Sequence, residues 1–135
     1  MSIDEINARR EARKAALAAR AAEQETRDIE ALDDFEAERG DTSVAAVRVA
    51  YTPGLTTMAI VRCPTRAEIK RFQARTKGKD PDVVAAATEL AEACLLYPQG
   101  EAYAQLVEAR PGLPVQLGTA AIRLATGQAE AEGKD

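Results

Sequence analysis

Carboxylates are the most abundant groups in this chain that could do chemistry, with 22 Asp and Glu among 135 residues. Acid–base catalysis would require two of them in a pocket whose surroundings push their pKa values apart. Nearly all of them fall on predicted exposed helix faces, as in the run Asp33, Asp34, Glu36 and Glu38. This placement indicates solvated surface rather than an active site.

Nucleophiles are few, and the chain has no histidine to activate them. The only serines are Ser2 and Ser43, so the usual Ser-His pair is excluded. Cys63 and Cys94 form no CxxC motif, and we interpret them as buried thiols, with a disulfide or a reactive thiol as alternatives. Phosphate-binding glycine loops and EF-hand spacings do not occur. We therefore expect no enzyme, no cofactor and no metal.

Basic residues gather between Arg9 and Arg20, and again between Lys70 and Lys79. A basic face is the usual footprint of a nucleic-acid-binding protein. Here the net charge is −4 with a pI near 5.0, and no aromatic residue interleaves with the first cluster. The charge argues against nucleic acid as a partner, so a regulator that uses Arg9–Arg20 remains only an alternative.

Length and hydropathy predict one domain with an appendage, in an unexported protein. No stretch approaches the roughly 18 apolar residues of a membrane span, and the polar N-terminus lacks a hydrophobic signal region. We divide the chain into a charged, alanine-rich helical extension (1–40), a compact domain (44–127) and a disordered tail (128–135).

The N-terminal segment is predicted to be one long helix, from residue 3 to the low thirties. Ser2 and Glu5 form a capping box, and ten alanines lie between residues 8 and 37. Coiled-coil spacing counted from Ile3 meets mostly arginines, so no seam is predicted. Only Ile29, Leu32 and Phe35 form a local apolar cluster, and Gly40 ends the segment.

The remaining elements are a β-hairpin and about four short helices. Apolar residues alternate on both sides of Thr52-Pro53-Gly54-Leu55, which has the sequence of a type II turn. An isolated hairpin is marginal in water, so it must pack on helices or gain a strand. Helices are expected from 66 to 78, from 81 to 97, up to Arg110, and from Pro114 to 127. The predicted fold is α+β, mainly α.

The adjacent residues Leu95, Leu96 and Tyr97 attract attention because they cannot all face one side of a helix. Something besides the core should cover Leu96, and a groove for an apolar helix is the obvious candidate. The residues predicted to form the partner surface or its supporting wall are Leu95, Leu96, Tyr97, Tyr103, Leu106 and Leu113.

The order of motifs after the hairpin is distinctive: "VRCPTRAEIKRF" (61–72), then "AAATELAEACLLYP" (85–98), then "YAQLVEARPGLPVQLGTAAIRLATG" (103–127). This order resembles the small tail assembly chaperones of long-tailed bacteriophages and prophages. The resemblance covers about residues 44–127. In that group an apolar-Tyr-Pro motif is followed by a Pro-Gly turn and a closing helix.

The resemblance implies a chaperone that binds the tape measure protein, a long apolar helical rod, until tail-tube subunits displace it. The tail tube protein is then a second expected partner, and self-association stays open. A structural subunit of the tail or head–tail junction, with residues 3–39 as an assembly arm, is the main alternative. Both hypotheses imply a location in the cytoplasm of the bacterial host, and neither requires a cofactor or a membrane.

Overall fold

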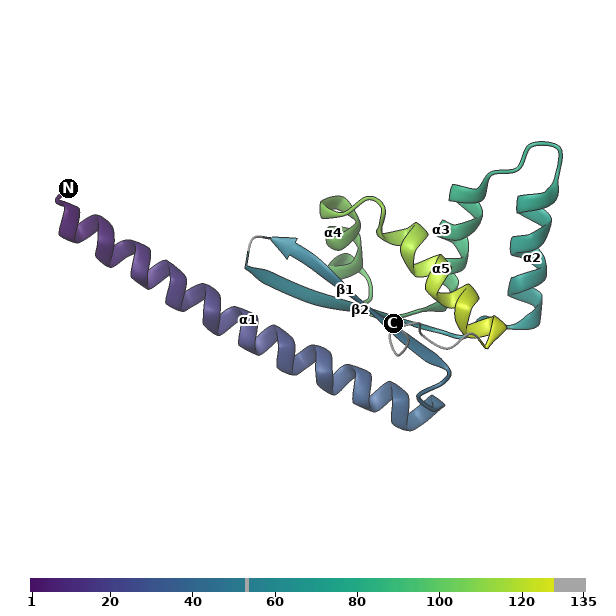
Figure 1. Ribbon diagram of the computed structural model, residues 1–135, viewed down its shortest axis with the longest axis horizontal. Coiled ribbons are helices and arrows are strands. Elements are labelled where there is room, and N and C mark those ends of the chain that lie inside the picture. The colour runs from purple at the N-terminus through teal and green to yellow at the C-terminus, as the bar shows by residue number, and fades with distance from the viewer. Residues whose placement is uncertain (53, 128–135) are drawn as a thin grey trace, which may run out of the picture.

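The structure is a computed structural model that describes residues 1–52 and 54–127. The described residues form five helices and three strands (Figure 1), and the predicted α+β, mainly α fold is confirmed. The predicted turn residue Pro53 and the predicted disordered tail 128–135 lie outside the described residues. The elements are α1 (Ile3–Arg39), β1 (Val44–Thr52), β2 (Leu55–Arg62), α2 (Arg66–Lys77), α3 (Val83–Cys94), β3 (Leu95–Tyr97), α4 (Glu101–Ala109) and α5 (Leu113–Thr126).

The three strands form one antiparallel sheet in the order β1-β2-β3. The hairpin prediction is confirmed: Val44 pairs with Arg62 and Thr52 with Leu55. Gly54 has φ +80°, a conformation that favours glycine. The hairpin gains its third strand from its own chain, because β3 pairs with β2 at Ile60 and Val61.

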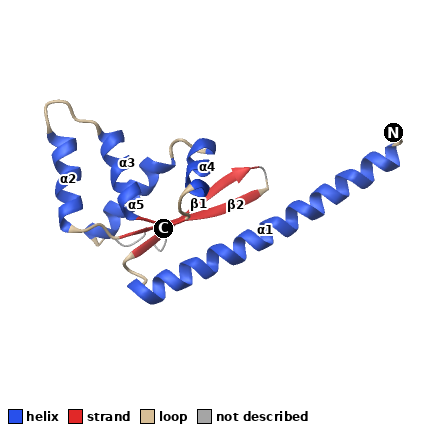
Figure 2. Ribbon diagram, turned by 180° about the vertical axis from the view of Figure 1, so that it is seen from behind, coloured by secondary structure: helices blue, strands red, loops and turns tan. Residues whose placement is uncertain are grey.

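Helices cover both faces of the sheet, with α1 on one side and α2 to α5 on the other (Figure 2). The central strand β2 is buried on both faces, so its apolar residues alternate between two cores. Ala59 and Val61 belong to the core beneath the four short helices. Met58 and Ile60 belong to a smaller core, which α1 covers with Leu32 and other partly buried residues.

The larger core depends on a close crossing of α3 and α5. Gly118 of α5 lies against Ala87 of α3, and a Cβ at position 118 would meet the Ala87 carbonyl oxygen at 2.7 Å. Leu90, Cys94 and Leu117 are nearly inaccessible beside this crossing. The small residues of the two helices therefore permit a tight packed layer over the sheet.

The prediction of one helix from 81 to 97 is wrong at its C-terminal end. Helix α3 stops at Cys94, and Leu95–Tyr97 continue as strand β3. Pro98 disfavours a helical conformation for the residue before it. Arg62 Nη2 donates a hydrogen bond (2.8 Å) to the carbonyl oxygen of Ala93, which satisfies one of the last helix acceptors.

Helix α1 extends to Arg39, further than predicted, and its two parts have different surroundings. The capping box at Ser2 is confirmed, as is the ending at Gly40. We call residues 17–36 the docked segment, because Leu17 touches Gly54 in the hairpin turn and Phe35 packs on the smaller core. Residues 3–16, the free segment, are exposed apart from a half-buried Ile6. The predicted extension therefore includes one wall of the domain.

Candidate partner-binding cleft

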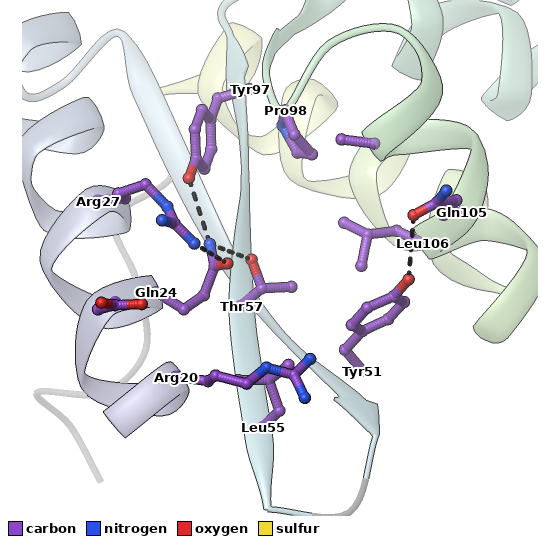
Figure 3. A pocket seen from close by; sticks show the side chains of 12 residues that line it. Arg20, Gln24, Arg27, Tyr51, Leu55, Thr57, Tyr97, Pro98, Gln105 and Leu106 are labelled. Carbon is purple, nitrogen blue, oxygen red and sulfur yellow. Dashed lines mark hydrogen bonds between the residues drawn. The ribbon is translucent and has the colours of Figure 1, made fainter. Parts of the chain in front are cut away.

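A cleft of about 530 Å³ lies between α1 and α4, beside the hairpin (Figure 3). This volume is within the usual range of ligand-binding sites. Helix α1 supplies one wall, α4 the other, and the strands lie between them. The lining residues are Arg20, Glu23, Gln24, Arg27, Tyr51, Leu55, Thr57, Tyr97, Pro98, Ala102, Gln105 and Leu106.

A hydrogen-bond network around a buried carboxylate supports the α1 side of the cleft. Asp28 is only 3% exposed, and its Oδ1 accepts hydrogen bonds from the Tyr97 hydroxyl (2.6 Å) and from Gln24 Nε2 (2.8 Å). Gln24 Nε2 also donates to Thr57 Oγ1 at 3.2 Å. A buried charge is tolerated when hydrogen bonds satisfy it, so this network joins α1 to β2 and β3.

The Tyr97 hydroxyl is held in its neutral form. Burial, together with the hydrogen bond to Asp28, raises the pKa of Tyr97 to about 12. At neutral pH the phenol therefore remains a hydrogen-bond donor to the carboxylate. The contact between α1 and β3 depends on that donor.

The surface of the cleft combines positive charge with apolar patches. Arg20 and Arg27 are exposed on the α1 wall, and Arg27 Nη2 donates to Gln24 Oε1 at 3.0 Å. On the opposite wall the Tyr51 hydroxyl donates to Gln105 Oε1 at 3.3 Å. Leu55, Leu106 and Pro98 supply apolar surface. Such a surface suits a polypeptide that carries both acidic and apolar side chains.

The six residues predicted as a partner surface fall into three groups. Tyr97 and Leu106 line the cleft, although the Leu106 side chain is largely buried. Leu95 and Leu96 are half-buried against opposite faces of the sheet, Leu96 on the side that α1 covers. Leu113 is 2% exposed in the larger core. The sequence predicted that something besides the core covers Leu96. That cover is α1 of the same chain, so Leu96 does not require a partner helix.

Tyr103, the sixth predicted residue, lies apart from the cleft in a second hollow of about 440 Å³. Its hydroxyl is buried and has no hydrogen-bond partner among the described residues. Burial raises the pKa of Tyr103, and nearby Glu92 raises it further. Tyr103 also contributes to the larger core, so its ring has a structural role.

The residues of the α1 wall were not predicted from the sequence. The docked face follows the positions Leu17, Ala21, Gln24, Asp28, Leu32 and Phe35. This spacing is close to a heptad pattern, but two of its central members are polar. The count from Ile3 met Leu17 and Gln24 but also four arginines, so it predicted no seam. A count that began at Leu17 and accepted polar members could have found this face.

Both cysteines are free thiols, and they do not form the disulfide that was one alternative. Cys94 is buried, and burial raises the pKa of its thiol to about 11, which makes it unreactive at neutral pH. Cys63 is half-buried.

Nearby, Arg62 forms a bidentate pair with Glu68 (2.9 and 2.8 Å), and these bonds lower the pKa of Glu68 to about 2. This pair fixes β2 to α2.

No protein-family model matches this chain, and comparisons with curated proteins and with solved structures found no significant match. Within residues 1–52 and 54–127, no group of His, Cys, Asp and Glu could hold a metal ion. No helix of these residues is long and apolar enough to cross a membrane. The cleft, the free segment and the motif order are therefore the features of this chain that bear on its function.

Proposed function

We propose that this protein is a non-enzymatic tail assembly chaperone, which binds the phage tape measure protein and keeps it soluble. The order of motifs over residues 44–127 supports this proposal, because it resembles that group of chaperones. A long apolar helical rod aggregates unless its surface is covered. A small protein with a net charge of −4 can cover such a surface and keep the complex dispersed.

The cleft between α1 and α4 is the observation that carries this proposal. Its walls come from both ends of the sequence, and Tyr97 and Leu106 of the predicted partner surface line it. Its chemistry suits binding of polypeptide, with arginine, tyrosine and glutamine around apolar leucines. Moderate affinity in each copy is sufficient, because many copies act along one rod.

A structural subunit of the tail is the second candidate, and the free segment favours it. Residues 3–16 form a helix that would extend about 21 Å beyond the domain, at 1.5 Å per residue. An exposed helix of this kind could order against neighbouring subunits. Deletion of residues 2–16 separates the candidates: a chaperone should still solubilise its partner, whereas an arm-dependent subunit should lose assembly.

Co-expression with the tape measure protein of the same phage or prophage tests the proposal. Ala102→Trp should fill the cleft and leave the tape measure protein in the pellet, because Ala102 is an exposed lining residue. Ala67→Trp is the matched control, since Ala67 is exposed at the same position of α2, second from its start.

The proposal predicts soluble tape measure protein with the wild type and with Ala67→Trp, at equal chaperone levels. If Ala102→Trp solubilises the partner as well as the control does, the cleft is not its binding site. If the wild-type chain leaves the partner insoluble and unbound, the chaperone function is wrong.

A further inference from the structure

The sheet has an edge that its own strands only partly cover. β1 pairs with β2 along nearly the whole hairpin, from Leu55 to Arg62. On the other side, β3 is three residues long and pairs only with Ile60 and Val61. Among the described residues, no strand pairs with β2 between Leu55 and Ala59 on that side. An unpaired edge of this kind is a template for another extended chain.

The cleft runs along this unpaired edge. Leu55 and Thr57 line it, and Figure 3 shows the strand that carries them between α1 and α4. Among the described residues, Gln24 Nε2 donates a hydrogen bond to the side-chain oxygen of Thr57 and not to its backbone. The part of this edge that borders the open space between the two helices is therefore Leu55–Thr57, because Met58 and Ala59 are buried and do not line the cleft.

The charge and shape of the walls define the occupant. Arg20 and Arg27 face the cleft from α1, against a single lining carboxylate, Glu23. Leu55 and Leu106 offer apolar contacts on the other side. A strand places successive side chains on opposite sides, so a sequence that alternates acidic and apolar residues would meet both walls. A helix would satisfy its own backbone and leave the edge unpaired.

We propose that the cleft binds an extended acidic segment of the partner protein, which adds to β2 as a strand in line with β3. Main-chain hydrogen bonds to Leu55–Thr57 give the affinity, and Arg20 and Arg27 select carboxylates. The inference rests on the proposed function for the source of the segment. The inference requires an extended conformation of the bound partner segment, whereas most of the proposed tape measure rod is helical.

The test uses the full chain labelled with ¹⁵N and a short capped peptide that alternates valine and glutamate. Binding at millimolar peptide should slow hydrogen exchange of backbone amides between Leu55 and Thr57. A peptide with lysine in place of glutamate should bind at least about tenfold more weakly, since the arginines would then repel it. Arg20→Glu combined with Arg27→Glu should reverse that preference.

Two further peptides separate strand addition from other contacts. Each carries N-methyl groups on alternate residues, one on the odd set and one on the even set. Only one edge of an added strand pairs with β2, so one peptide should lose binding and the other should keep it. Equal binding of both peptides, or no binding of the unmodified peptide, would overturn the inference.

The complex with the tape measure protein distinguishes this inference from the proposed function. If the partner stays soluble and bound but the amides of Leu55–Thr57 gain no protection, strand addition is wrong and the chaperone function stands. If the acidic peptide pairs with β2 while the tape measure protein is not bound, the strand site stands and the assigned partner is wrong.

Discussion

The two parts of α1 belong to one continuous helix but depend on different physics. The docked segment (17–36) packs on the sheet, and it buries Asp28 and half-buries Leu32 and Phe35. The free segment (3–16) is exposed apart from half-buried Ile6, and its apolar end residue Ile3 is 74% exposed. Helical propensity is high in both parts, so the difference arises from tertiary contacts.

The free segment is stabilised locally and by its continuity with the docked segment. Isolated helices of its length are marginal in water even when rich in alanine. Its capping box satisfies two backbone groups, with Glu5 Oε1 accepting from Ser2 N–H at 2.8 Å. The docked segment provides the folded helical turn from which the helix of the free segment propagates. One continuous helix therefore forms a wall of the domain through its docked segment and projects from the domain through its free segment.

Removal of residues 1–40 should have the largest effect. The deletion uncovers Met58, Ile60 and Leu96 on one face of the sheet and removes the acceptor of the Tyr97 hydroxyl. We expect loss of cooperative unfolding and aggregation on purification, measured by circular dichroism and light scattering. A soluble, cooperatively folded 41–135 fragment would contradict the distinction between the two segments.

Phe35→Ala should destabilise the protein by about 2 kcal/mol. Complete burial would make the loss larger, about 3–5 kcal/mol, but Phe35 is only half-buried. Ile6→Ala in the free segment is the matched control and should change the free energy of unfolding by less than about 0.5 kcal/mol. Urea denaturation of both variants checks the difference, and equal losses would refute it.

Asp28→Ala should destabilise by about 1.5 kcal/mol, because Tyr97 and Gln24 lose their acceptor in a buried site. Asp28→Asn retains an acceptor oxygen and should lose less. Glu11→Ala, at an exposed position of the free segment, should be close to neutral. Chemical denaturation at pH 7 measures all three, and a neutral Asp28→Ala would show that the network does not hold α1.

The sequence predicted the elements whose signals are local. The hairpin, α2, α4 and α5 agree with alternation, capping residues and Pro-Gly breaks. Strand β3 was missed because its three residues continue the stripe of α3, and only pairing with Ile60 and Val61 makes them a strand. The α1 wall was missed because Gln24 and Asp28 are polar, and they become interior only when Tyr97 and Thr57 supply partners. Tyr97 and Leu106, which line the cleft, were predicted from the crowded apolar residues around the Tyr97-Pro98 break.

The free energy of unfolding should also depend on alkaline pH. The folded pKa of Tyr97 is raised from 10 to about 12, so the folded state binds the proton more tightly than the unfolded state. This contribution is fully present below pH 10 and is lost as the pH rises toward 12. Tyr97→Phe should therefore show a shallower fall in unfolding free energy over this range. Tyr103 and Cys94 also have raised pKa values, so the slope difference between wild type and variant is the quantity to compare.

Hydrogen exchange along α1 in the full chain tests the central claim most directly. Amides of residues 24–36 should exchange only through global unfolding, whereas those of residues 6–14 should exchange far faster through local opening. A sharp rise in protection beginning between Leu17 and Gln24 is the predicted result. Uniform protection along α1, or uniform fast exchange, would contradict the division of α1 into a docked segment and a free segment.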